Sequence, residues 1–195
     1  WRWTFYALAT WAVIALGLVI FLVPESLVKQ DRSALNIKNI ALNFRELLRT
    51  RSYVGYLLTL MFSFSTFFAF IFGAPFVFID IFGLTESTFA LLITVLVGGF
   101  MVGTLLVEPL VNRFGARRIL SFGVMIAWAS GIMVAAFPLI GIQTIPTIIG
   151  PMIMFAFSIG FIFPLGTAGA LAPFPHIAGL ASAFLGFSQT VSGVF

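Results

Sequence analysis

The sequence YVGYLLTLMFSFSTFFAFIFGAPFVFIDI occupies Tyr53–Ile81, and Asp80 is the only charged residue in it. A helix needs roughly 20 apolar residues to cross a hydrocarbon core about 30 Å thick, and this run is longer than that. Strands of a membrane barrel would alternate polar and apolar residues, which this run does not do. Tyr53–Ile81 is therefore predicted to be a membrane-spanning helix.

Apolar runs of the same kind lie on both sides of it. They are Trp3–Val23, Ser87–Val111, Ile119–Phe137, Pro146–Ala170 and Ala178–Phe195. The fold class predicted is all-α, a polytopic membrane helical bundle with six helices. Because the sequence opens on Trp1 without an initiator Met and stops at Phe195 inside an apolar run, we expect an internal piece of a larger protein whose last helix is cut short.

The composition excludes a soluble fold. Of the 195 residues, 61% are hydrophobic and 8% are charged, whereas soluble domains carry about 25% charged residues. The chain has no Cys, which excludes disulfides, thiolate metal sites and cysteine nucleophiles. His176 is the single His, and HExxH, GxSxG and phosphate-cradling Gly-Lys-Ser/Thr motifs are missing, so we expect no enzyme, no metal and no cofactor.

The basic residues gather in the connections between the apolar runs. If the helices alternate in direction, 24–52, 112–118 and 171–177 share one side and hold nine of the ten Lys and Arg. Arg2 is the tenth and lies on the other side. The positive-inside rule then places the basic connections in the cytoplasm. With its charges placed this way, the net charge of +4 does not indicate a nucleic-acid partner.

The connection Pro24–Ser52 contains an amphipathic pattern. From Ile37 onward the apolar residues recur at helical spacing, while Lys38, Arg45 and Arg49 fall on a separate stripe. Such a helix suits the inner headgroup layer, with its basic residues toward anionic lipid. A helix packed under the bundle as a strut fits the same pattern, so both interpretations stay open.

Small residues and prolines predict where helices pack closely and where they bend. Pro75 and Pro164 each remove a backbone donor from a helix, which favours a hinge. Stripes of small residues let backbones approach closely in lipid, and they indicate either static packing or the sliding surface of a moving transporter. The stripes are Gly99 and Gly103; Ala156, Gly160 and Pro164; and Ala178, Ser182, Gly186 and Thr190.

A substrate site is predicted along the Phe-rich run 53–81. Phe64, Phe68 and Phe72 follow one another at intervals of four residues, and Phe76 continues the row. A wall of Phe suits flat lipophilic cations through dispersion and cation–π contact, although the same rings fit a surface that faces lipid tails. Asp80, near the outer end, is either an attractor for a cationic substrate or an interfacial residue, and no carboxylate is predicted at mid-membrane depth.

The connection Asn112–Arg118 joins two helices through a tight turn. It places Arg113, Arg117 and Arg118 around Gly115, which permits the turn. Arg side chains bind carboxylates and the carboxyl ends of neighbouring helices, which predicts a latch that closes the inner face in one conformation. Topogenic charge alone explains the arginines equally well.

Four segments resemble the major facilitator superfamily and, within it, the Bcr/CflA-type drug/proton antiporters. They are Trp1-Arg2-Trp3-Thr4-Phe5, Val23-Pro24-Glu25-Ser26-Leu27, Phe163-Pro164-Leu165-Gly166-Thr167-Ala168-Gly169-Ala170 and Pro173-Phe174-Pro175-His176-Ile177-Ala178-Gly179. Together they span nearly the whole chain.

The resemblance implies a part for each region of the sequence. Residues 1–23 would be helix six of twelve, 24–52 the cytoplasmic central loop, and 53–195 the carboxyl-terminal half-bundle of helices seven to eleven, the last one truncated. In the family, helices seven, eight, ten and eleven line the central cavity. This implies a set of cavity candidates, which are Phe68, Phe72, Phe76, Gly160 and Gln189. The proton-handling acidic residue and the antiporter motif of helix five would lie outside this chain.

Asn112–Arg118 resembles the inner-loop motif Asp-Arg-x-Gly-Arg-Lys of the superfamily, with two departures. Asn112 stands at the acidic position and Ala116 at the first basic one. The resemblance therefore implies a weaker latch, made by the remaining residues Arg113, Gly115, Arg117 and Arg118.

The expected function is proton-coupled efflux of lipophilic, often cationic drugs across the bacterial inner membrane by alternating access. The proton gradient would supply the energy, and the partners would be small lipophilic molecules, protons and membrane lipid, with a monomer expected. An exporter of a small metabolite such as an amino acid or a sugar is the alternative, and a membrane scaffold is a third interpretation. The scarcity of charged groups for a polar substrate favours drugs.

Overall fold

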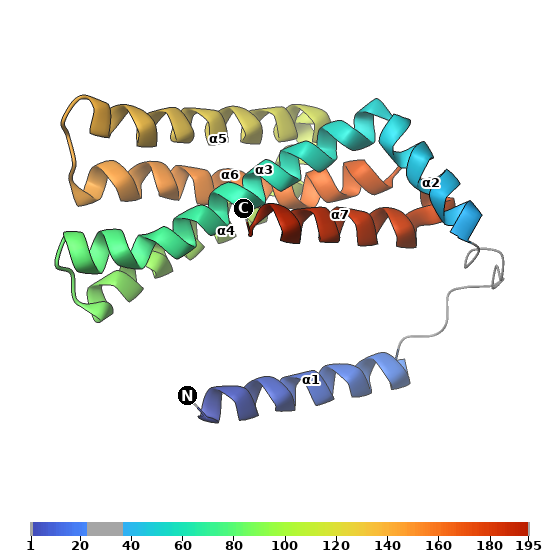
Figure 1. Cartoon of the computed structure of the whole chain (residues 1–195), viewed down its shortest axis with the longest axis horizontal. Coiled ribbons are helices and arrows are strands. Elements are labelled where there is room, and N and C mark those ends of the chain that lie inside the picture. Colours follow the sequence, from blue (N-terminus) through green and yellow to red (C-terminus); the bar gives the residue numbers. More distant parts are fainter. Residues whose placement is uncertain (1, 23–36, 195) are drawn as a thin grey trace. The chain divides into compact units, whose positions relative to one another are not determined.

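The computed structural model describes residues 2–22 and 37–194, which fall into two units, one ending at Ile40 and one beginning at Ala41. Every regular element in the described residues is a helix (Figure 1). The first part of the predicted connection 24–52, the segment Val23–Leu27 and the last residue of the run Ala178–Phe195 lie outside the described residues.

The first unit contains the helix α1, Arg2–Leu22, whose 21 residues make about 31 Å of helix. This length matches the hydrocarbon core of a membrane. Within this unit none of its described residues is buried, and its side chains are almost all apolar, which suits a helix of membrane length.

The second unit is a helical bundle. Helix α2, Ile37–Arg49, contributes its residues from Ala41 onward. The remaining elements are α3, Arg51–Pro75, which continues into the π-helical segment η2, Phe76–Ile81; α4, Glu86–Phe114; α5, Ala116–Leu139; α6, Ile145–Leu171; the 3-10 turn η3, Pro175–Ile177; and α7, Ala178–Ser192.

Five of the six predicted membrane-spanning helices are confirmed. Helices α1, α3 with η2, α4, α5 and α6 are long and apolar enough to cross a membrane. The sixth run forms α7, whose 15 residues make only about 22 Å of helix. Within the described residues α7 is therefore shorter than a complete span.

Helix α6 is the centre of the bundle. Helices α3, α4 and α5 all pack against it, while α7 packs mainly against α3 (Figure 1). Because the hydrophobic effect does not drive helices together in lipid, close approach at small residues is what holds them. Helix α6 offers Ala156, Gly160 and Gly166 for this, and all three are buried.

Among the residues that the structure describes, three hydroxyl groups donate hydrogen bonds from one helix to the backbone of another. The Tyr53 hydroxyl donates to the Ala181 carbonyl oxygen at 2.8 Å and joins α3 to α7. The Ser130 hydroxyl donates to the Pro151 carbonyl oxygen at 2.6 Å and joins α5 to α6. The Ser192 hydroxyl reaches the Met61 carbonyl oxygen at 3.1 Å.

The variant Ser130→Ala tests the α5–α6 bond. Ser130 is 1% exposed, so its loss leaves the Pro151 carbonyl buried without this donor. We expect the free energy of unfolding in mixed micelles to fall by about 0.6–1.7 kcal/mol. Ser121→Ala is the matched control, because Ser121 is exposed and its hydroxyl bonds only to Arg117 of its own helix. An equal loss in both variants would contradict a special role for Ser130.

The part of α2 in the second unit packs against the bundle. Leu47 is fully buried, and the Phe44 ring meets the Phe184 ring of α7 edge-on, with centroids 4.9 Å apart. Arg45 and Arg49 lie on the exposed side. This arrangement favours the strut interpretation of the amphipathic pattern for residues 41–49, and it leaves Arg45 and Arg49 facing outward, while the Lys38 side chain lies outside the described part of the chain. The cytoplasmic location of the helix stays a prediction.

Candidate functional site

Phe64, Phe68 and Phe72 form a continuous row of rings along α3. The ring centroids are 4.6 Å apart between Phe64 and Phe68, and 5.6 Å apart between Phe68 and Phe72. Because four residues exceed one turn of 3.6, each successive ring is rotated by about 40° around the helix. The row therefore winds from the packed side, where Phe64 and Phe68 are half-buried, to the open side, where Phe72 is 69% and Phe76 is 62% exposed.

The start of this row rests against the end of α7. A Cβ on Gly193 would lie 3.3 Å from the Phe64 ring and 3.4 Å from the Phe68 ring. The missing side chain lets α7 approach both rings, and the hydrogen bond from the neighbouring Ser192 holds it there. Gly193 carries no sequence signal that would have singled it out.

Pro75 and Asp80 lie at the other end of the row. Pro75 has no backbone N–H, so the carbonyl of Ile71 loses its usual helical partner. The Phe76 N–H donates to the Gly73 carbonyl, and the chain continues as the π-helical segment η2. Such segments are frequent at functional sites. The predicted hinge therefore coincides with a change of helix type, and η2 carries the exposed Asp80.

An apolar cavity of about 250 Å³ lies beside the row, between α3, α4 and α6. From α3 it is lined by Phe67 and Ile71, each one position before a predicted cavity residue. None of the predicted cavity residues lines it. A sequence pattern could have identified Phe67 and Ile71. Together with Ala74 and Phe78 they are spaced by four, three and four residues, and Ala74 and Phe78 are 3% and 0% exposed. Residues at this spacing share the packed face of a helix.

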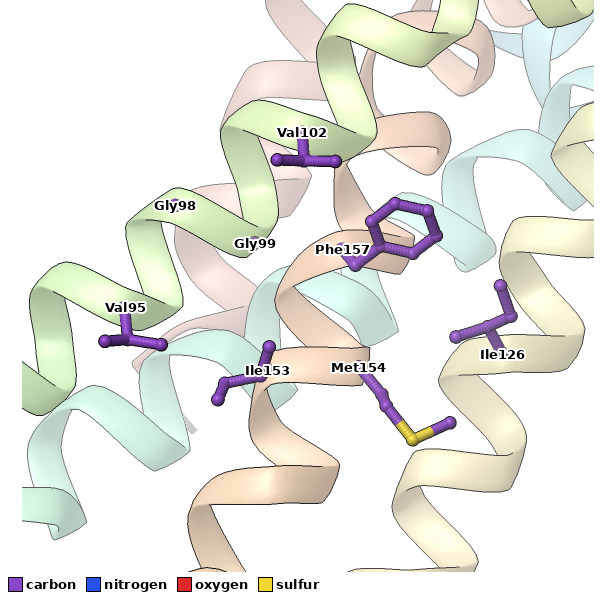
Figure 2. Close-up of a pocket in the computed structure, with 8 residues that line it drawn as sticks. All are labelled: Val95, Gly98, Gly99, Val102, Ile126, Ile153, Met154 and Phe157. Atoms are coloured by element: carbon purple, nitrogen blue, oxygen red, sulfur yellow. The ribbon is translucent and has the colours of Figure 1, made fainter.

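A larger apolar groove of about 530 Å³ lies on the opposite face of α4. Figure 2 shows it between α4 and α5, with α6 behind. Val95, Gly98 and Val102 line it from α4, Ile126 from α5, and Met154 and Phe157 from α6. Every lining residue is apolar, so the groove fits hydrocarbon and offers no charged or hydrogen-bonding side chain.

Gly160 lies where α6 crosses α4 and not on an open surface. It is buried, and a Cβ on it would lie 2.7 Å from the Thr104 amide nitrogen and 2.8 Å from the Phe100 carbonyl oxygen. Across the contact, a Cβ on Gly103 would overlap the carbonyl oxygen of Phe157. In this conformation Gly160 serves close helix packing, and its predicted place in a substrate cavity stays a prediction.

The structure separates the other candidates on α6 and α7. Gln189 is half-buried on α7, four residues before Gly193, and so on the side of α7 that approaches the Phe64 and Phe68 rings. Pro164 is exposed within α6. Of the two, Gln189 is the one that the fold brings close to the aromatic row.

The α4–α5 connection is a tight, exposed turn. Gly115 makes it with a φ of 86°, a conformation that a side chain would strain. Asn112, Arg113, Arg117 and Arg118 are all exposed, and the Arg113 guanidinium lies 5.3 Å from the centroid of the Phe114 ring. In the described part of the chain, the one close contact between a basic and an acidic side chain joins His176 to Glu46 at 3.5 Å. No described carboxylate therefore latches these arginines in this conformation.

Carboxylates are confined to the helix ends in the membrane-length helices that the structure describes. Asp80 lies in the last turn of the α3–η2 span, and Glu86 begins α4. Glu108 lies six residues before the end of α4, and all three are exposed. Residues 2–22 and 37–194 also contain no group of three His, Cys, Asp or Glu that could hold a metal ion.

A family model described as the Major Facilitator Superfamily matches residues 1–195. The chain belongs to the major facilitator superfamily. It is thus assigned to a multi-pass membrane transporter and not to an enzyme, in agreement with the membrane-length helices and with the resemblance seen in the sequence.

Three relatives extend this assignment. A bicyclomycin resistance protein homolog of Haemophilus influenzae is 29% identical over 189 residues, which are 95% of this chain and 46% of that protein. An uncharacterized MFS-type transporter of Bacillus subtilis, YdgK, is 25% identical over 202 residues, 99% of this chain and 48% of the relative. Multidrug resistance protein D of Escherichia coli is 44% identical over 55 residues, 28% of this chain and 14% of the relative. The chain spans about half the length of the first two relatives.

Proposed function

We propose that the complete transporter exports lipophilic cations from a bacterial cell, across the inner membrane, in exchange for protons. The observation that carries this proposal is the row of Phe rings on α3, which ends in two exposed rings and the carboxylate of Asp80. Relatives named for bicyclomycin resistance and multidrug resistance support a drug as the substrate.

The chemistry of the row suits a cation that carries its own apolar body. A cation near the face of an aromatic ring is stabilised by about 0.5–2 kcal/mol, and more when water is excluded. Successive rings offer this interaction along a path and not at one point. A polar metabolite would need several charged groups, which the described helices lack at mid-depth.

The transport cycle would rock the two halves of the transporter around a midplane site. The basic connections would face the cytoplasm, and Pro75 and Pro164 would let their helices bend. Arg113, Arg117 and Arg118 would steady the inner face when it closes. The group that carries the proton would lie outside this chain, because the described spans place carboxylates only near their ends.

The variant Phe72→Ala tests the proposal in the complete gene product, expressed in a bacterial strain that lacks its own drug pumps. Cells are loaded with a fluorescent lipophilic cation, and its loss is followed with and without a protonophore. We expect protonophore-sensitive loss, slowed about five- to tenfold by Phe72→Ala because a cation–π contact of about 1–1.4 kcal/mol disappears.

Trp128→Ala is the matched control. Trp128 is 72% exposed on α5, close to the 69% of Phe72, and lies half a turn from the buried Ser130 that faces α6. We expect this variant to transport at the unaltered rate. If the transporter is present in the membrane but no cation leaves, the drug proposal fails, and a screen of amino acids and sugars would address a metabolite exporter.

A further inference from the structure

The apolar groove of Figure 2 continues along α4 toward the α4–α5 turn. Val95 and Val102 line the groove, and Leu106 and Arg113 follow Val102 by four and eleven residues. Residues separated by four, seven and eleven positions lie on one face of a helix. Leu106 is 38% exposed, so this face leads along open apolar surface from the groove to a guanidinium.

Helix α5 carries a matching stripe. Ile126 lines the groove, and Phe122 and Arg118 precede it by four and eight residues. Phe122 is 49% exposed, and its ring lies 6.4 Å from the ring of Phe161 on α6. At about 100° per residue, Arg117 lies on the side of α5 opposite Ile126. Arg118 therefore belongs to the stripe, and Arg117 does not.

The two stripes have the depth of one membrane leaflet. Along α4, about 16 Å of helix separates Val102 from Arg113, and along α5 about 12 Å separates Ile126 from Arg118. Each leaflet contributes about 15 Å to the hydrocarbon core. A molecule with its charge at the two arginines and a chain parallel to the helices would thus reach the groove.

We propose that an anionic phospholipid binds here, with its phosphate at Arg113 and Arg118 and one acyl chain in the groove between α4 and α5. Charge decides between the candidate occupants, because the arginines have no carboxylate partner among the described residues and the groove has no polar or charged side chain. An anion with a hydrocarbon tail satisfies both ends, whereas a lipophilic cation meets like charge at the two arginines and no carboxylate in the groove. The site does not depend on the proposed transport function.

Photolabelling of the complete gene product in phosphatidylcholine nanodiscs tests this proposal. The probe is phosphatidylglycerol with a diazirine midway along one acyl chain, and the comparison probe is phosphatidylcholine with the same chain. After illumination, mass spectrometry measures the label on the α6 peptide that contains Met154 and Phe157. We expect phosphatidylglycerol to label this peptide about 30-fold more than phosphatidylcholine, because each of the two arginines attracts an anionic lipid with a free energy of about 1 kcal/mol.

Two pairs of variants separate the two ends of the site. Arg118→Gln should lower the preference for phosphatidylglycerol to about five-fold, because Arg113 remains, while Arg117→Gln, with the same charge change, should keep most of the preference. Gly98→Leu fills the groove and should abolish labelling by both probes, whereas Gly131→Leu on α5 should not. A Cβ added to Gly98 or to Gly131 would meet no atom within 4 Å, so both positions have open space where a larger side chain begins.

Three results would overturn the proposal. Equal labelling by both probes in the unaltered protein would mean contact without selection of an anion. Loss of the label on addition of tetraphenylphosphonium would show that a cation occupies the groove. The third result has two parts: the unaltered protein is a dimer whose groove is not labelled, and Gly98→Leu converts it to a monomer. This result would show that a second copy of the chain covers the groove.

Discussion

Replacing Gly103 by Leu is expected to prevent α4 from docking on α6. A Cβ at this position would overlap the carbonyl oxygen of Phe157, and the Gly160 Cα would lie 3.3 Å from it. The obstacles are backbone atoms, which cannot rotate away as the tip of a side chain can. The helices would have to separate, and the apolar cluster around Leu96 and Ile159 would open with them.

The expected cost is large. Overpacking in a core costs about 1–3 kcal/mol where side chains adjust, and more where backbones must move. We therefore expect Gly103→Leu to lower the free energy of unfolding by more than about 3 kcal/mol. Size-exclusion chromatography of the complete gene product in detergent, with the midpoint of thermal aggregation, measures this effect.

Gly131→Leu serves as the matched control for this experiment. Gly131 is an exposed glycine of α5 with open space around its Cβ position, and Leu is a better helix former than Gly. This variant should elute as a single peak with an unaltered or higher midpoint. Equal behaviour of the two variants would show that the α4–α6 contact is not as close in the folded protein as the structure has it.

Replacing Tyr53 by Ala is expected to detach α7 and α2 from α3. Tyr53 is fully buried, its hydroxyl donates to the Ala181 carbonyl at 2.8 Å, and its ring meets the ring of Phe174 edge-on at 5.5 Å. It also lies over Phe184, which in turn contacts Phe44 of α2. One side chain therefore links three helices.

Two substitutions divide this effect into its parts. Tyr53→Ala removes ring and hydroxyl and should lower the free energy of unfolding by about 3–5 kcal/mol. Tyr53→Phe keeps the ring and should cost about 0.6–1.7 kcal/mol for the lost hydrogen bond. Limited digestion with trypsin provides a local readout, because Arg45 and Arg49 become better substrates when α2 leaves the bundle.

The control for Tyr53 is Phe62→Ala on the same helix. Phe62 is 70% exposed, so its removal opens no cavity in the bundle. We expect little change in stability and no faster cleavage in α2. Faster cleavage at Arg45 in this variant as well would argue that α2 responds to general loosening and not to the loss of Tyr53.

At the candidate site, helical spacing in the sequence predicts some features of the structure and not others. The intervals of four residues correctly predict neighbouring rings from Phe64 to Phe72, which the centroid distances describe, while the continuation to Phe76 stays a prediction. They do not predict that the row winds from the packed to the open side, nor that Phe67 and Ile71 line the cavity. Residues spaced four apart rotate gradually around the helix. The spacing therefore predicts which side chains are neighbours, but not which face of the helix packs against other helices.

For the amphipathic segment, too, the sequence predicts one part of the arrangement and the tertiary structure decides the rest. Its apolar stripe predicts a buried face but fits a lipid surface and a protein surface equally. The structure favours the protein surface, because Leu47 and Phe44 pack against the bundle. Part of that packing surface is Phe184, which lies more than a hundred residues further along the chain. No local pattern contains that surface.

The membrane-spanning helices, by contrast, follow from the order of residues alone. In hydrocarbon every backbone group needs a hydrogen-bond partner, which only helices and closed barrels provide, and a run such as Tyr53–Ile81 lacks the alternation of a barrel strand. Which faces meet is a different matter, because apolar side chains gain little by leaving lipid for one another. The close contacts of Gly103 with Gly160 and of Gly193 with Phe64 depend on complementary surfaces that form only when the helices pack together. Hydropathy along the chain thus determined the spans, and the fit of small residues in three dimensions determined the bundle, the cavity and the groove.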